Sequence, residues 1–137
     1  MQGLQAVASL VGRILLATIF LVSGYGKLMA PEGTQKHMAD AGLPLVQVLY
    51  VLTVIVELGG GVLLVVGWRA RIPAAVLFLF LIPVTLTFHT NFAEPMQQFQ
   101  FLKNLAIMGG LLTVVAFGPG SISVDGQARR GRPGGRR

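Results

Sequence analysis

The carboxylate of Glu57 lies near the middle of an apolar stretch, residues 48–64, that is long enough to cross the hydrocarbon core of a membrane. A charged side chain near the bilayer centre costs about 2.5 to 3.5 kcal/mol on insertion scales, so such residues usually face inward, find a partner and mark a functional site. Glu57 therefore predicts a polar site inside a helical bundle. The other apolar stretches are expected to supply the groups that share this site.

Each of the other three apolar stretches also carries polar or basic side chains. The candidates for ligand binding are Arg13, Lys27, Tyr50, Thr53, Glu57, Thr85, His89, Lys103 and Asn104, and the candidates for catalytic proton transfer are His89, Glu57 and Lys103. Haem is not expected, because ligation by two histidines needs a second buried histidine and His37 falls in a predicted loop. No metal is expected either, since one histidine and one carboxylate are too few ligands.

The composition is that of an integral membrane protein. Of the 137 residues, 53% are hydrophobic and only 12% are charged, which is too apolar for an ordinary soluble domain. The absence of cysteine excludes disulfides, thiolate metal sites and dithiol redox chemistry.

Four membrane-spanning helices are predicted, at about residues 4–27, 43–68, 72–92 and 99–117. The connections between them are short, so successive helices must be antiparallel. The segment 30–42 is predicted to be a polar loop. We therefore expect one all-α domain, residues 1–120, folded as an integral membrane four-helix antiparallel bundle with up-down-up-down topology. Residues 121–137 are predicted to be a disordered basic tail.

Most of the excess positive charge lies at one end of the chain. The formal net charge is +6, and five of the eleven basic residues are Arg129, Arg130, Arg132, Arg136 and Arg137. This tail is expected to contact anionic lipid headgroups, and nucleic-acid binding is not expected without a soluble basic face. Seven basic residues fall on the side of the termini and two on the other side, so both termini are predicted to be cytoplasmic.

A helix rises about 1.5 Å per residue, so residue counts give the depth of each polar side chain in the membrane. These depths fall into two levels. Measured from the predicted cytoplasmic ends, Arg13 and Glu57 lie about 14 and 16 Å deep, which predicts an ion pair between them. His89 and Lys103 lie further out, at about 26 and 22 Å. These depths predict a polar cavity that opens outward and has Arg13 and Glu57 as its floor.

Each of these residues also has a structural interpretation. Arg13 and Glu57 would also be explained by an ion pair that only fixes helix register. His89 would be explained by a histidine hydrogen-bonded near the membrane interface, and Lys103 by a lysine side chain that extends toward the headgroups. The sequence leaves these interpretations open beside ligand binding.

The order of these motifs resembles the DoxX family of small bacterial membrane proteins. The resemblance covers nearly all of residues 10–125, and its motifs are Arg13-Ile14-Leu15-Leu16, residues 20–28, Glu57 before Gly59-Gly60, Gly67-Trp68-Arg69, His89, Lys103-Asn104-Leu105 and Gly109-Gly110. The resemblance implies four membrane helices in the bacterial plasma (inner) membrane. It also implies a link to oxidative stress, because relatives are associated with thiosulfate:quinone oxidoreductase, superoxide dismutase and a thiosulfate sulfurtransferase.

Three functions follow as hypotheses. The leading one is a redox-associated subunit that binds a quinone or quinol in the cavity, since quinone chemistry needs proton donors and acceptors reached from the lipid. The second is a non-catalytic protein that anchors peripheral oxidoreductases. The third is a small-solute transporter, for which four helices would be expected to work as a homodimer.

Overall fold

The computed structural model describes residues 2–131, and that part of the chain is entirely helical and irregular, without strands. Its helices are α1 (Gln2–Met29), α2 (Pro31–Asp40), α3 (Val46–Val66), α4 (Arg71–Phe88), α5 (Pro95–Phe117) and α6 (Val124–Arg130). Four of them, α1, α3, α4 and α5, are long and apolar enough to cross a membrane. The prediction of an all-α protein with four spans is therefore confirmed.

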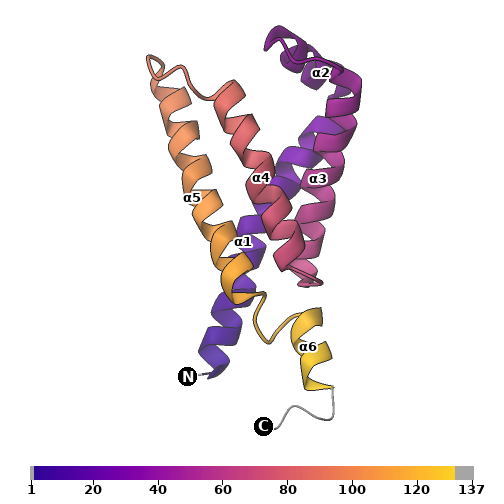
Figure 1. The fold of residues 1–137 in the computed structure, drawn as a ribbon, viewed down its shortest axis with the longest axis vertical. Helices are drawn as coiled ribbons and strands as arrows, with labels where there is room; N and C mark the ends of the chain where they lie inside the picture. The colour runs from indigo at the N-terminus through magenta and orange to yellow at the C-terminus, as the bar shows by residue number, and fades with distance from the viewer. Residues whose placement is uncertain (1, 132–137) are drawn as a thin grey trace.

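The four long helices alternate in direction (Figure 1). The start of α1, the turn between α3 and α4, and α6 lie at one end of the molecule, here called the terminal end. The short helix α2 and the connection between α4 and α5 lie at the other, the α2 end. Helix α1 packs mainly on α3 and α4 mainly on α5, and the two pairs are joined chiefly through α3 and α4. In Figure 1 the pairs spread apart toward the α2 end.

Small residues bring the helices together where the two helix pairs lie close to each other. A Cβ atom added to Gly60 would lie 2.9 Å from Cγ of Leu77, and one added to Gly110 would lie 2.8 Å from Cδ2 of Leu16. Both distances are shorter than ordinary Cβ contacts, so a side chain at either position would force the facing leucine to shift. By contrast, a Cβ atom at Gly59 or Gly109 would meet nothing within 4 Å.

The core is small because most apolar side chains face outward. Its members are Ala17, Phe20, Leu64, Ala70, Ala74, Leu77, Leu81, Leu111 and Val114. Large apolar residues such as Leu15, Val22 and Leu79 are more than half exposed on the outside of the bundle. This arrangement suits a protein whose surrounding solvent is lipid.

Local signals explain where the helices begin and end. Gly67 ends α3 with φ of 72°, and the backbone N–H groups of Gly67 and Trp68 both donate to the carbonyl of Leu63. Glycine is favoured there because the left-handed conformation strains other residues. Pro31 and Pro95 begin α2 and α5, where a missing N–H costs nothing.

The segment 30–42 is not the loop that we predicted. Residues 31–40 form α2, an amphipathic helix at the α2 end whose Met38 is buried. The polar residues of this segment are typical of a loop, but Pro31 suits the first turn of a helix.

The predicted tail also differs from the structure over residues 121–131. Ser123 caps α6, its Oγ accepting from the N–H of Gly126 at 3.0 Å. The carboxylate of Asp125 accepts from the backbone N–H groups of Arg69 at 2.8 Å and Ala70 at 3.1 Å. The C-terminal segment is thus docked against the turn before α4, because Asp125 binds two backbone N–H groups of that turn. Arg132, Arg136 and Arg137 lie outside the described residues.

Candidate ligand-binding site

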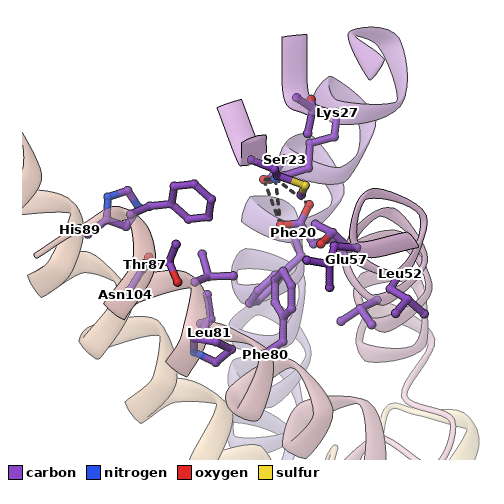
Figure 2. Close-up of a pocket in the computed structure, with 18 of the residues that line it drawn as sticks. Phe20, Ser23, Lys27, Leu52, Glu57, Phe80, Leu81, Thr87, His89 and Asn104 are labelled. Atoms are coloured by element: carbon purple, nitrogen blue, oxygen red, sulfur yellow. Dashed lines mark hydrogen bonds and ion pairs between the residues drawn. The ribbon is translucent and has the colours of Figure 1, made fainter. Parts of the chain in front are cut away.

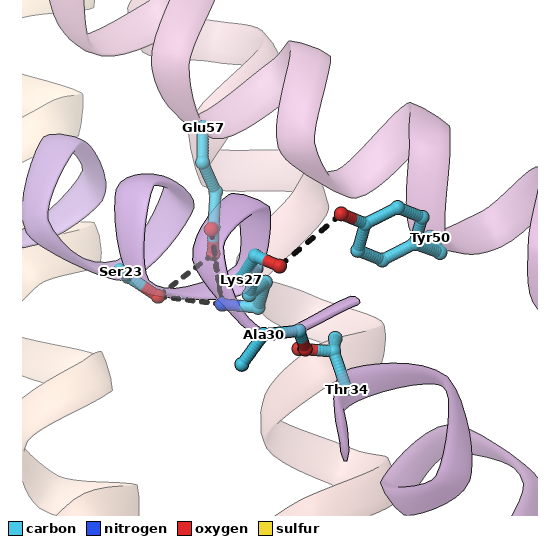
Figure 3. Close-up of polar contacts among 6 residues, drawn as sticks. All are labelled: Ser23, Lys27, Ala30, Thr34, Tyr50 and Glu57. Carbon is cyan, nitrogen blue, oxygen red and sulfur yellow. Dashed lines mark hydrogen bonds and ion pairs between the residues drawn. The ribbon is translucent and has the colours of Figure 1, made fainter. Parts of the chain in front are cut away.

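Glu57 is bound by Lys27, which comes from the neighbouring helix α1 (Figure 3). The Nζ atom of Lys27 lies 3.0 Å from both carboxylate oxygens of Glu57. Ser23, one turn before Lys27, donates to Oε1 of Glu57 at 3.2 Å and accepts from Lys27 at 2.6 Å. The Glu57 side chain is only 7% exposed and that of Lys27 26%. The three residues form a compact, mostly buried polar cluster that needs no further partner for its charges.

A glycine positions this cluster. A Cβ atom at Gly24 would lie 2.9 Å from Cγ of Leu58 and 3.1 Å from Cβ of Glu57. Gly24 therefore lets α1 and α3 approach closely at the level where Lys27 must reach Glu57. Tyr50 adds a second link, because its hydroxyl donates to the backbone carbonyl of Lys27 at 3.1 Å (Figure 3).

The predicted ion pair between Arg13 and Glu57 is wrong. Arg13 is 1% exposed and lies nearer the terminal end, where Nη1 donates to the carbonyls of Leu64 at 2.7 Å and Val65 at 2.9 Å. Nη2 donates to the carbonyl of Ile122 at 2.5 Å. Arg13 therefore ties the end of α3 to the C-terminal segment. Arg13 and Glu57 do not lie at the same depth, because the start of α1 extends beyond the turn that follows α3 (Figure 1). Depths counted from these two helix ends are therefore not measured from the same level.

A cavity of about 500 Å³ lies beside the Lys27–Glu57 cluster, between the α1–α3 pair and the α4–α5 pair. Most of its lining is apolar, with Phe20, Leu52, Phe80 and Leu81 among the lining residues (Figure 2). Ser23, Lys27 and Glu57 lie on one side of it and His89 and Asn104 on the other (Figure 2). Such a size, with an apolar lining and a few polar groups, is typical of small-molecule sites.

The second polar wall comes from the end of α4 and from α5. Nδ2 of Asn104 donates to Oγ1 of Thr85 at 2.9 Å, and both side chains are buried. Lys103, one residue earlier on α5, lines the cavity and donates to the side-chain carbonyl of Gln100. His89 lies one residue beyond α4 and caps it through its backbone N–H. Burial, with the positive charges of Lys103 and His37 nearby, lowers the pKa of His89 below its usual range, which favours the neutral imidazole.

Helix α2 covers the cavity at the α2 end. Thr34, His37 and Met38 line the cavity from this helix. The ring of His37 stacks on Phe88 of α4, with centroids 4.9 Å apart and an angle of 18° between the planes. This contact links α2 to the other helix pair across the top of the cavity.

Six of the nine predicted site residues line the cavity, namely Lys27, Thr53, Glu57, His89, Lys103 and Asn104. The other three have different positions: Arg13 holds the terminal end, Tyr50 binds the Lys27 carbonyl, and Thr85 orients Asn104. The predicted cavity floor therefore has Glu57 but not Arg13.

Four polar lining residues, Ser23, Thr34, His37 and Thr87, are not among the predicted site residues. Ser23 was interpreted only as a small packing residue, although its spacing of four from Lys27 places both on one helix face. His37 was assigned to a loop. Within residues 2–131, no three His, Asp or Glu side chains gather closely enough to hold a metal ion.

Comparison with known proteins identifies the family. A family model described as DoxX matches residues 8–90. The chain is 37% identical over 125 residues to inner membrane protein YqjF of Escherichia coli (strain K12), covering 91% of this chain and 95% of that protein. It is 34% identical over 127 residues to inner membrane protein YphA of the same strain, covering 88% and 90%.

A more distant similarity reaches a eukaryotic protein. The chain is 31% identical over 123 residues to the Surfeit locus protein 4 homolog of Schizosaccharomyces pombe (strain 972 / ATCC 24843), covering 85% of this chain and 36% of that protein. No solved structure matches. Together with the four apolar helices, the family model and the two bacterial relatives show that this chain belongs to the DoxX family of multi-pass inner membrane proteins.

Proposed function

We propose that this protein binds a small lipophilic ligand of the quinone or quinol class in the cavity between its two helix pairs. The observation that carries the proposal is the lining of the cavity: apolar over most of its area, with hydrogen-bonding groups on two opposite sides. A flat ring with an oxygen at each end needs this combination, because each oxygen requires a partner and the ring between them does not.

The polar residues have distinct roles in this proposal. Lys103 and Asn104 bind one ring oxygen, and Thr85 keeps the Asn104 amide in place through its 2.9 Å hydrogen bond. His89, favoured as the neutral imidazole, accepts a proton from a bound quinol hydroxyl. Lys27 and Glu57 bind the opposite oxygen through the face of their cluster that lines the cavity. The chain thus supplies binding and proton exchange to a redox partner.

Ligand extraction tests this proposal. The protein would be purified in a mild detergent, and bound small molecules identified by mass spectrometry for wild type, His89→Ala and Asn104→Leu. Thr113→Val is the matched control, because Thr113 is exposed on α5 and does not line the cavity. A quinone held by wild type and the control, but reduced at least tenfold in the cavity variants, is the expected result.

Two results would contradict the proposal. The first is a set of samples that contain only phospholipid, equally in all four proteins. The second is added short-chain quinone that binds wild type and Asn104→Leu with the same affinity. Either result would favour the anchoring function, in which peripheral oxidoreductases bind the ends of the bundle and the cavity is structural.

We further propose that both termini are cytoplasmic. Arg69, Arg71, Arg129 and Arg130 belong to the terminal end, whereas Lys27 and Lys36 belong to the α2 end, and short basic segments favour the cytoplasm. Because the chain has no cysteine, single introduced cysteines report the topology directly. In intact spheroplasts, Lys36→Cys should react with a membrane-impermeant maleimide and Arg129→Cys should react only after lysis. The reverse pattern would invert the topology.

A further inference from the structure

Lys103 is a cation in the cavity without an acidic partner. The charged residues that line the cavity are Lys27, Lys103 and Glu57, so with neutral histidines the lining carries two positive charges and one negative, a net charge of +1. Glu57 is already bound by Lys27 through both oxygens. Across residues 2–131 the ion pairs are Lys27–Glu57 and Lys36–Asp40, and the Nζ atom of Lys103 donates a hydrogen bond to the neutral side chain of Gln100.

This unpaired charge favours an anion in the cavity. Lys103 lies eight residues inside α5, about 12 Å from the start of the helix, so it is well below the end of the bundle. A charge inside a membrane protein is costly unless it is paired or reaches water. A single negative charge on a ligand would bring the net charge of the lining to zero, and the attraction is stronger in this apolar setting than in water.

The shape of the cavity indicates how such a ligand enters. Two lining residues, Ile19 of α1 and Leu52 of α3, are 37% and 51% exposed. Both are apolar residues of membrane-spanning helices, which favours a lateral opening of the cavity toward the lipid, while α2 lines the cavity at the α2 end. An apolar chain can extend through this lateral opening while its headgroup stays inside.

We propose that the ligand of this cavity is an acidic amphiphile, bound as its anion with the charged headgroup on Lys103 and its apolar chain directed toward the lipid. This inference rests on the proposed function, because it assigns a charge to the lipophilic ligand of the same cavity. Among quinone-like molecules it selects those with an ionised hydroxyl group. Carboxylates and phosphate-bearing lipids share this chemistry.

A pair of probes that differ only in charge tests the inference. Radiolabelled decanoic acid and decan-1-ol would be titrated at pH 8 against the full chain in nanodiscs of uncharged phosphatidylcholine, with empty nanodiscs subtracted. Wild type should bind the acid at least tenfold more tightly than the alcohol. Lys103→Gln should reduce this preference to within twofold. Lys103→Arg, which keeps the charge, should preserve the preference.

Lys36→Gln is the control, because Lys36 is exposed and paired with Asp40 outside the cavity. It should leave the preference for the acid unchanged. Equal affinity for acid and alcohol in wild type, or a preference that survives Lys103→Gln, would overturn the inference. If a short-chain quinone still competed with the alcohol, the proposed function would stand without it; if neither probe nor the quinone bound, both would fail.

The source of the anion is resolved by the lipid composition. Displacement of decanoate when phosphatidylglycerol is added to the nanodiscs would identify a lipid headgroup as the ligand. Retention of decanoate would identify a free acid. Both results would support the binding of an anion to Lys103.

Discussion

Lys27 and Glu57, thirty residues apart in the chain, form a salt bridge of 3.0 Å beside the cavity, and both belong to the α1–α3 pair. Their partnership explains why a carboxylate is tolerated in the middle of a membrane helix, because each charge is compensated and Ser23 supplies a further hydrogen bond.

Removing one member of this pair should destabilise the bundle more than removing both. We expect Lys27→Met to cost about 3 kcal/mol, since it leaves the buried Glu57 without a partner. Glu57→Gln should cost less, because Lys27 is 26% exposed and can turn toward water. The double variant should recover part of the loss. Thermal unfolding in detergent, followed through the fluorescence of Trp68, measures all three. Equal losses that add in the double variant would show that the two residues do not interact.

Gly24 should be intolerant of any branched side chain. Gly24→Val would place atoms within about 3 Å of Leu58 and Glu57, so α1 and α3 must separate and the reach of Lys27 to Glu57 must lengthen. Gly26→Val is the matched control, because a Cβ atom there meets nothing within 4 Å. The melting temperature should fall for the first variant and change little for the second. Similar melting temperatures for both would contradict the close approach of the helices at Gly24.

Arg13 should stabilise the terminal end without affecting the cavity. Arg13→Met removes three hydrogen bonds from a charged donor to backbone carbonyls, at a cost of about 3 kcal/mol or more. The C-terminal segment should then be released, and trypsin should cut at Arg129 and Arg130 several-fold faster. Asp125→Asn should show a smaller increase, because it weakens the contacts to Arg69 and Ala70 but keeps the three hydrogen bonds of Arg13. Unchanged proteolysis in both variants would show that these contacts do not hold the segment.

Stability should fall as pH drops from 8 to 5, in part because of His89. Its folded-state pKa is lowered by burial and by nearby positive charge, so the unfolded chain binds the proton more readily. The stabilisation is therefore fully present above the unfolded pKa of about 6.5 and is lost as pH falls through that value toward the folded pKa. His89→Gln should flatten the melting-temperature profile in this range. An unchanged slope would show that His89 does not titrate differently in the two states.

The sequence predicted which residues line the cavity better than it predicted their hydrogen-bond and ion-pair partners. Apolar length and the positions of Lys27, Glu57, His89 and Lys103 were enough to place four helices and to predict a shared polar cavity. Helical rise gives depth along one axis only, however. It contains no information on how far one helix slides past another, and this offset decided that Lys27 rather than Arg13 meets Glu57.

The short segments were the least predictable part. Residues 31–40 and 124–130 are polar and lack the apolar length of a span, so their sequences resemble loops. They are helical because tertiary contacts stabilise them: His37 stacks on Phe88, and Asp125 accepts from the backbone N–H groups of Arg69 and Ala70, just before α4. Isolated helices this short are marginal in water, and packing supplies most of their stability.

By itself, the sequence determined the class of solvent, the number of spans and their alternating direction, because these depend on composition and on the lengths of apolar segments. The family resemblance rested on the order of its motifs. The tertiary structure alone decided which charges pair, that α2 covers the cavity, and that Lys103 is left without an acid. Those outcomes depend on the rotation and offset of packed helices, which are set by contacts such as Gly24 against Leu58 between residues far apart in the chain.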